Sequence, residues 1–334
     1  MGINLLNLEP HKVSRDLSGY ITYIYGPKKI GKTTFAAQMP GMLLCAFEKG
    51  YNALAGVIAQ DITNWGEMRM VAAQLKKPEV KKKFKGVAID TIDIAVDLAT
   101  KYVCGRENVD TISQIPWGGG WTMVKKELEE CFRSITQAGY AVIFISHDKD
   151  KTFKKEDGTE FNQIVPTISA TYNEIISGMV DIYGYAHSII VDGQPKRVLT
   201  LRSFDGSIDC GCRFKYIEPE IDFSYPALVK ALNEAIDKEA ELSNGEFVTE
   251  DRNVTETKDL DFDALLKEFN TMTEELNEKD KDKFKEFYTP RITEIIEKYL
   301  GKGKKINNAN RSQAEQVSLI VYDVKELIDS NKSE

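Results

Sequence analysis

One octapeptide near the start of the chain limits its possible folds more than any other feature. Residues 26–33 read GPKKIGKT, which fits the pattern G-x-x-x-x-G-K-[ST] at every fixed position. The octapeptide follows the apolar run Tyr20–Tyr25, and its last two residues begin a predicted helix over Lys32–Gln38. Between a strand and a helix, glycines let the backbone amides turn toward an anion, and the helix N-terminus adds a positive dipole end. The sequence therefore predicts a phosphate-binding loop.

The side chains of this loop predict a nucleotide with a magnesium ion. Lys32 would reach the β- and γ-phosphates, and the Thr33 hydroxyl would bind Mg²⁺. ATP and Mg²⁺ are the predicted ligands, and the residues expected to surround the nucleotide are Gly26, Pro27, Lys28, Lys29, Ile30, Gly31, Lys32, Thr33 and Thr34.

Polar residues at the ends of three other apolar runs complete the predicted site. Asp90 ends the run Gly86–Asp90 and is the expected second magnesium ligand. Nearby Asp93 is the competing carboxylate, although its place in a helix N-terminus is the preferred interpretation. Glu48 follows the run Met42–Phe47 and is the candidate general base, because Thr91 occupies the position after Asp90. His147 follows the run Tyr140–Ser146 and is the candidate sensor of the γ-phosphate.

The alternation of apolar runs and amphipathic stretches predicts an α/β fold with a mostly parallel sheet. Two further strands, Val180–Ile190 and Arg197–Ser203, are expected to form a hairpin at Asp192–Pro195 that adds antiparallel strands to the sheet edge. Besides the helix after the loop, the predicted helices of this region are Ile92–Val103, Thr122–Ala138 and Ser224–Leu242.

The charge distribution predicts the domain boundaries. The net charge is −8, yet residues 234–263 hold 11 acidic and 3 basic side chains and so carry the whole excess. We therefore expect a core at residues 1–242, an acidic flexible linker at 243–260 and a small all-α C-terminal domain at 261–334. With the acid confined to the linker, the acidic total does not exclude a nucleic-acid partner.

The five cysteines have neither the number nor the spacing of a disulfide framework or a zinc site. No apolar run approaches the length needed to span a membrane, and the first residues lack the apolar segment of a signal peptide. The sequence predicts a cytoplasmic protein with no membrane partner.

The order Gly26–Thr33, Glu48, Asp90, Ser146-His147 resembles RecA-like ATPases, in which a strand ending in the catalytic Glu follows the phosphate loop along the chain and precedes the Asp strand. More narrowly, the segments IYGPKKIGKTTFA, LLCAFEKG, VAIDTID and VIFISHDK are similar to phage-encoded nucleotide-binding proteins of the AAA ATPase class, including RecA-like single-strand annealing proteins. This similarity covers residues 10–235. Lys28-Lys29-Ile30 departs from the Pro-Gly-rich loop interior of that group. The resemblance implies a RecA-like P-loop NTPase core, self-assembly into a ring or filament on DNA, and ATP hydrolysis at subunit interfaces in a bacterial host cell.

The resemblance also implies a basic residue supplied by the neighbouring subunit and two DNA-binding loops. Basic candidates lie on the last strands, with Arg202 and Arg213 preferred over Lys196 and Arg197. The expected loops are residues 114–121 and 148–168, since cations attract phosphates and aromatic rings stack on bases. The predicted nucleic-acid contacts are Trp117, Trp121, Lys149, Lys151, Phe153, Lys154 and Lys155.

These observations favour an ATPase that oligomerises on single-stranded DNA and promotes annealing or recombination in a phage or prophage. Two alternatives stay open. One is a nucleotide-gated adaptor or loader that binds a single-strand-binding protein or another replication protein through the C-terminal helices. The other is a P-loop kinase of a small molecule, which the long polar segment after His147 disfavours.

Overall fold

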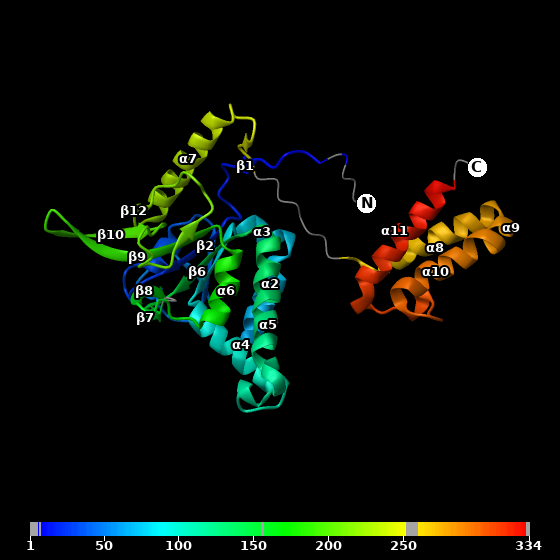
Figure 1. Cartoon of the computed structure of the whole chain (residues 1–334), viewed down its shortest axis with the longest axis horizontal. Coiled ribbons are helices and arrows are strands. Elements are labelled where there is room, and N and C mark those ends of the chain that lie inside the picture. Colours follow the sequence, from blue (N-terminus) through cyan, green and yellow to red (C-terminus); the bar gives the residue numbers. More distant parts are fainter. Residues whose placement is uncertain (1–5, 7, 155–156, 252–259, 332–334) are drawn as a thin grey trace. The chain divides into compact units, whose positions relative to one another are not determined.

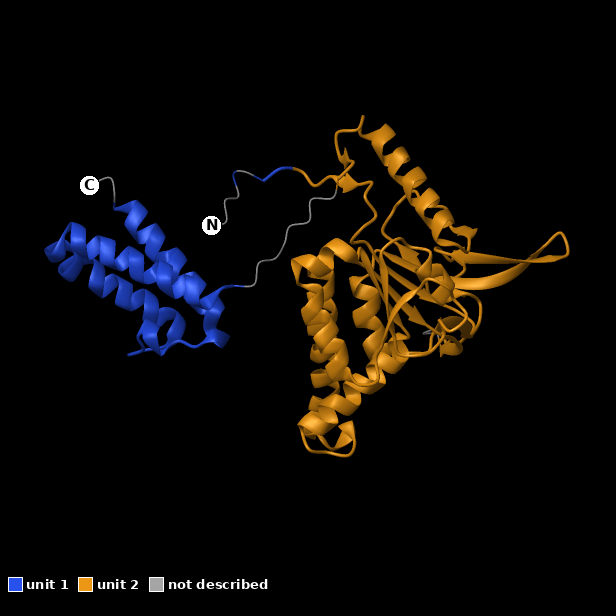
Figure 2. Ribbon diagram, turned by 180° about the vertical axis from the view of Figure 1, so that it is seen from behind, with its two compact units in different colours: residues 1–9, 257–334 blue, residues 10–256 orange. Residues whose placement is uncertain are grey.

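The computed structural model describes residue 6 and residues 8–154, 157–251 and 260–331. The chain divides into two compact units (Figure 2), residues 10–256 and residues 257–334 with 1–9. We call them the core unit and the helical unit.

The core unit is built on one twisted sheet whose strands run in the order β12-β10-β9-β2-β6-β5-β3-β4, with β11 paired to β9. The six strands from β9 to β4 are parallel to their neighbours, and β10, β11 and β12 pair antiparallel at the other edge. The strands are β2 (Ile21–Tyr25), β3 (Met42–Ala46), β4 (Ile58–Asp61), β5 (Gly86–Asp90), β6 (Ala141–Ser146), β9 (Ile182–Val191), β10 (Gln194–Thr200), β11 (Gly211–Cys212) and β12 (Glu220–Asp222).

Helices cover both faces of this sheet (Figure 1), because successive side chains of a strand point to opposite faces and both sets are apolar here. Tyr23 packs in the layer with α2, α4, α5 and α6, while Ile24 packs in the layer with α1 and α7. The helices are α1 (Lys32–Ala37), α2 (Trp65–Leu75), α3 (Pro78–Lys83), α4 (Ile92–Arg106), α5 (Gly119–Gln137), α6 (Ala170–Met179) and α7 (Tyr225–Leu242). Short 3₁₀ turns at Ile112–Gln114 and Pro116–Gly118 join α4 to α5.

The predicted α/β fold with a mostly parallel sheet is confirmed, and the predicted strands and helices differ from the observed ones by a few residues at their ends. One detail of the edge hairpin differs from the prediction. The strand β9 pairs parallel with β2, so only its partner β10 reverses direction.

Residues 148–168, predicted as a loop, form a second sheet instead. The strand β7 (Asp148–Lys154) pairs antiparallel with β8 (Glu160–Pro166). The cross-strand pair of Phe153 and Phe161 explains the hairpin, since the two rings stack with centroids 5.5 Å apart. The polar composition of this segment hid the strands.

The predicted flexible linker begins too early. Val248–Thr249 forms a short strand, β13, which pairs parallel with β1 (Val13–Ser14) at the start of the core unit. Arg15 adds ion pairs to Asp237 at 2.6 Å and to Glu250 at 3.2 Å. Residues 243–251 therefore belong to the core, and the remaining linker prediction falls mostly on residues 252–259, outside the described residues.

The helical unit consists of amphipathic helices packed on a small apolar core of its own. Phe269, Ile296 and Ile320 are among the side chains buried there. Its elements are α8 (Phe262–Lys279), α9 (Lys281–Lys283), a π-helix (Phe284–Tyr288), α10 (Thr289–Leu300), two 3₁₀ turns (Ile306–Asn308 and Arg311–Gln313) and α11 (Ala314–Ser330). No helix in the described part of the chain has the length and apolar character needed to cross a membrane.

Candidate nucleotide-binding site

The predicted phosphate loop connects β2 to α1 and has a backbone that depends on its glycines. At Gly26, φ is +156°, and an added Cβ would stand 2.1 Å from the backbone oxygen of Ala186 on β9. At Gly31, φ is +110°, a conformation that residues with a Cβ rarely adopt. Lys29 between them also has a positive φ, of +66°. The loop therefore winds closely past β9 before α1 begins.

The side chain of Lys32 lies within this loop and is hydrogen-bonded to its backbone. Its side chain is only 6% exposed, and Nζ donates to the carbonyl oxygens of Gly26 at 2.6 Å and Pro27 at 2.8 Å. Burial lowers the pKa of the ammonium group, and the surrounding carboxylates, Asp90 first, oppose that shift. The charge is thus placed within the curve of the loop, as binding of phosphates requires.

Thr33 and Asp90 have the geometry of a magnesium site. Thr33 Oγ1 donates to Asp90 Oδ2 at 2.6 Å, so the hydroxyl and the carboxylate already lie side by side. Asp90 is only 4% exposed, and burial raises the pKa of its carboxyl. Mg²⁺ prefers hard oxygen ligands and keeps several waters, so these two side chains next to the phosphate loop fit the ion.

Glu48 and His147 come from strands on either side of β5 and meet over the end of it. The carboxylate oxygen Glu48 Oε1 is 3.5 Å from His147 Nε2 and 3.4 Å from the hydroxyl of Thr91. The other ring nitrogen, His147 Nδ1, is 3.4 Å from Lys32 Nζ. The strand order explains this arrangement, because β6 lies between β2 and β5, and β3 lies beyond β5. Both side chains therefore lie at the carboxyl edge of the sheet with the loop.

The end of β6 is tied to the hairpin that follows it. The carboxylate of Asp93, in the first turn of α4, accepts hydrogen bonds from the hydroxyls of Ser146 and Thr167. Asp93 lies in the first turn of a helix, as predicted, and both of these hydrogen bonds are made by its Oδ1. The amide of Thr167 also donates to the His147 carbonyl oxygen at 2.9 Å. The backbone of His147 is therefore hydrogen-bonded to the residue that follows β8.

The basic candidates for a neighbouring subunit make contacts within their own chain. Arg202 donates to the carbonyl oxygens of Phe214 at 2.8 Å and Lys215 at 3.2 Å, which accounts for its half-buried guanidinium. Arg213 is 3.5 Å from Asp181, at the start of β9 and away from the loop edge of the sheet. The role in a neighbouring site stays a prediction for both residues.

The predicted nucleic-acid residues lie in two separate places. Trp117 is fully exposed (102%) in a left-handed turn between α4 and α5, while Trp121 is 42% exposed in α5. Trp121 lines a cleft of about 570 Å³ that also reaches Lys28 and His147. Lys149, Lys151, Phe153 and Lys154 lie on β7, and Lys155 lies outside the described residues. Nucleic-acid contact by any of them stays a prediction.

Arg197 makes a contact that the sequence did not predict. It was one of the candidates for a neighbouring site, yet its Nη1 donates to the carbonyl oxygen of Ile30 in its own phosphate loop at 3.1 Å. No spacing rule connects β10 to this loop, which is 167 residues away in sequence.

Together the loop, the buried Lys32 and the paired Thr33 and Asp90 on a mostly parallel sheet define a P-loop nucleotide-binding protein. Residues 18–208, more than half of the chain, match the family model described as the AAA domain, and the chain belongs to this family. The chain is also similar to the SPbeta prophage-derived uncharacterized protein YorG of Bacillus subtilis (strain 168). The two are 29% identical over 338 residues, covering 98% of this chain and 99% of that protein.

Proposed function

We propose that this protein is a Mg²⁺-dependent ATPase that assembles on single-stranded DNA and promotes annealing or recombination in a phage or prophage. The observation that supports ATPase activity is that Lys32, the Thr33–Asp90 pair and the Glu48–His147 pair lie together at one edge of the sheet. Similarity to a prophage-derived protein supports the biological setting.

In the proposed reaction, a water molecule attacks the γ-phosphorus and the bond to the β–γ bridging oxygen breaks, giving ADP and phosphate. Glu48, whose side chain is 39% exposed, takes the proton from that water, and Lys32 balances charge on the phosphate oxygens. Magnesium, when bound by Thr33 and Asp90, would neutralise the β- and γ-phosphate oxygens. His147 contacts both Glu48 and Lys32, so its position depends on what occupies the γ-phosphate site.

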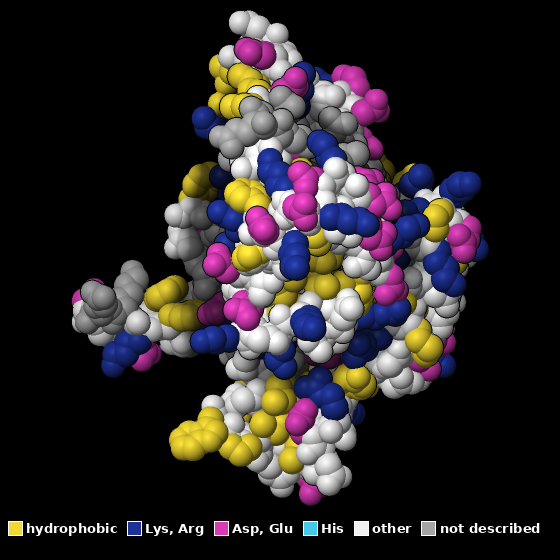
Figure 3. Space-filling view, turned by 90° about the vertical axis from the view of Figure 1, so that its right-hand side faces the viewer, with side chains coloured by type: hydrophobic (Ala, Val, Ile, Leu, Met, Phe, Trp, Pro, Cys, Tyr) yellow, Lys and Arg dark blue, Asp and Glu magenta, His cyan; other side chains and the backbone are white. Residues whose placement is uncertain are grey.

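The hairpin of β7 and β8 is the proposed DNA contact. Alternation along β7 places Lys151 and Phe153 on the same face, and Lys151 Nζ lies 4.5 Å from the centroid of the Phe153 ring. The cross-strand partner Phe161 extends this aromatic surface. A cation beside stacked rings suits a strand of any sequence, because each nucleotide offers a phosphate and a flat base. Basic and acidic side chains intermix over the face shown in Figure 3, and the proposed contact is limited to this hairpin.

The test is the ATPase rate with and without a mixed-sequence single-stranded oligonucleotide, at two salt concentrations. We expect DNA to raise the rate, and higher salt to weaken the effect because cation–phosphate contacts are lost. Glu48→Gln should lower the rate about 10²–10⁴-fold while nucleotide binding survives. Phe153→Ala and Lys151→Ala should weaken stimulation by DNA, and Lys230→Ala, an exposed lysine on α7, is the matched control. A rate insensitive to DNA at low salt would refute the DNA part of the proposal.

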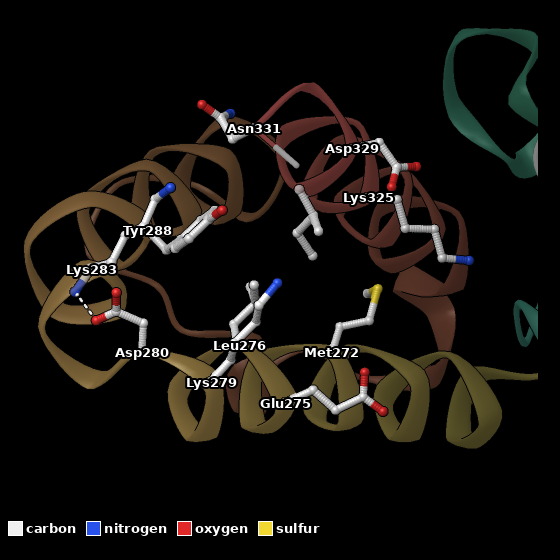
Figure 4. A pocket seen from close by; sticks show the side chains of 11 residues that line it. Met272, Glu275, Leu276, Lys279, Asp280, Lys283, Tyr288, Lys325, Asp329 and Asn331 are labelled. Carbon is white, nitrogen blue, oxygen red and sulfur yellow. Dashed lines mark hydrogen bonds between the residues drawn. The ribbon is translucent and has the colours of Figure 1, made fainter. Parts of the chain in front are cut away.

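A nucleotide-gated adaptor is the second candidate, and a groove in the helical unit favours it. The groove, of about 700 Å³, has an apolar floor that includes Met272, Leu276 and Tyr288. In Figure 4, Met272 and Leu276 of α8 lie on one side of this space and Tyr288 of the π-helix lies on the other. If Glu48→Gln abolishes hydrolysis and the protein keeps its biological activity, the adaptor is the better account. Phosphate transfer to a small acceptor instead of water would favour the kinase.

A further inference from the structure

Arg197 contacts the phosphate loop from a distant part of the chain. It lies on β10, pairs across the sheet with Ser188 of β9, and sends its guanidinium to the carbonyl oxygen of Ile30 at 3.1 Å. The contact is within one chain, so it needs no neighbouring subunit.

The geometry of a peptide bond gives this contact a consequence for the anion site. The Ile30 carbonyl and the Gly31 amide belong to one planar unit and point in opposite directions when that unit is trans. A donor that fixes the carbonyl therefore also fixes the direction of the Gly31 N–H. In this motif the backbone amides of the loop hold the phosphate oxygens. Arg197 thus acts on an amide that it does not itself touch.

The second glycine of the motif leaves the space that the guanidinium needs. A Cβ on Gly31 would stand 2.9 Å from Arg197 Nη1, inside van der Waals contact. The same strand is attached to the helix that follows the loop. The Arg197 carbonyl accepts from the Phe223 amide at 3.0 Å, and the Phe223 ring stacks on Phe35 of α1 with centroids 5.2 Å apart. The backbone of Arg197 and the helix α1 that follows the loop are therefore held together through Phe223.

We propose that Arg197 is a positioning residue of the nucleotide site, acting within its own chain. It orients the Ile30–Gly31 peptide so that the Gly31 amide is ready for a phosphate oxygen, and it adds a positive charge beside the loop. The proposal rests on the proposed function only for nucleotide binding, and it is independent of DNA and of hydrolysis.

The test measures nucleotide affinity directly and hydrolysis separately. We expect Arg197→Ala to raise the Kd for Mg-ADP and the KM for ATP about tenfold, about 1.4 kcal/mol of binding free energy, with kcat within about twofold of the wild type. Arg197→Lys keeps the charge and one donor and should recover most of the affinity. Arg291→Ala is the matched control, because that arginine also donates to a backbone carbonyl, at 2.9 Å, but in the helical unit.

Two outcomes would overturn the proposal. One is a wild-type Kd in Arg197→Ala, and the other is a loss of affinity that Arg197→Lys does not restore. If the wild type binds nucleotide but hydrolyses none, the ATPase proposal fails while the Kd comparison still tests Arg197.

Mixing a variant impaired in hydrolysis with a variant impaired in nucleotide affinity separates an action within the chain from one on a neighbour. Glu48→Gln subunits retain Arg197, and Arg197→Ala subunits retain Glu48. If Arg197 completed a neighbour's site, mixed assemblies would regain high-affinity hydrolysis. We expect no such recovery at low ATP concentration, and recovery would refute the action within the chain.

Discussion

Replacing Thr33 by valine tests the hydrogen bond between Thr33 and Asp90 in the predicted magnesium site without disturbing the shape of the core. Valine has nearly the volume of threonine, so no cavity forms, but Asp90 Oδ2 loses the hydroxyl that donates to it at 2.6 Å. Hydrogen bonds to charged groups contribute about 1.5–3 kcal/mol, and Asp90 is almost fully buried. We expect Thr33→Val to lower the free energy of unfolding by that amount, and Thr33→Ser to cost under about 1 kcal/mol.

The assay is urea unfolding followed by tryptophan fluorescence, without nucleotide and with a chelator. All three tryptophans, Trp65, Trp117 and Trp121, lie in the core unit, so the signal reports that unit alone. In thermal unfolding the loss corresponds to roughly 3–12 °C, at about 2–4 °C per kcal/mol for a unit of this size.

The pH dependence of the Thr33→Val cost gives a second check on the same reasoning. Burial raises the pKa of Asp90 and the Thr33 hydrogen bond lowers it, so valine should raise this pKa further. The cost of the substitution is then greatest where Asp90 is ionised, and it disappears at low pH where the carboxyl is protonated. Equal stability of the valine and serine variants at pH 7.5, or a cost that does not change with pH, would refute the argument.

Three further predictions concern other parts of the core. Gly26→Ala should abolish nucleotide binding and lower the free energy of unfolding by about 1–3 kcal/mol or more, because the added Cβ would overlap the main chain of β9. Gly178→Ala, where an added Cβ meets open space beside α6, is the control and should leave Mg-ADP titrations unchanged. Asp90→Asn should become more stable than the wild type as pH rises. Because the folded-state pKa of Asp90 is raised, its contribution to the free energy of unfolding is complete below pH ~4 and is lost as pH rises through that folded pKa. Unfolding without nucleotide from pH 4 to 7 should therefore show a widening difference in stability between the variant and the wild type. The buried Trp65 N–H donates to Glu127 at 2.9 Å, and Glu127→Leu removes this acceptor. We expect Glu127→Leu to lower the free energy of unfolding in urea by about 1–3 kcal/mol, and Glu127→Gln to lower it by less than half of that. Equal losses in the two variants would contradict the reasoning.

The sequence predicted those features that depend on local pattern. Gly26–Thr33 has fixed spacing, and Asp90, Glu48 and His147 each follow a continuous apolar run, so their common edge could be derived from parallel pairing alone. The distances between these side chains could not be derived from the sequence, because they depend on the order of the strands in the sheet, which is a long-range property.

The missed features lack such a pattern. The strands β7 and β8 hold many polar and charged residues and few apolar ones, and cross-strand contacts such as the Phe153–Phe161 pair become visible only in the structure. Arg197 reaches the loop only because β10 is the neighbour of β9 at the sheet edge. The short strand β13 lies in an acidic, polar stretch, and only its partner β1, more than 230 residues earlier, makes it a strand.

The pairing of β1 with β13 brings the first and last strands of the core unit side by side, with Val13 opposite Val248. A unit whose ends meet can be reconnected without stretching its chain. A short peptide could join residue 251 to residue 10, and new ends could be opened in the exposed turn at Asp192-Gly193, the tip of the β9–β10 hairpin. Such a circular permutant would keep β2, the phosphate loop and α1 contiguous, so we expect the core unit to fold in this permuted order as well.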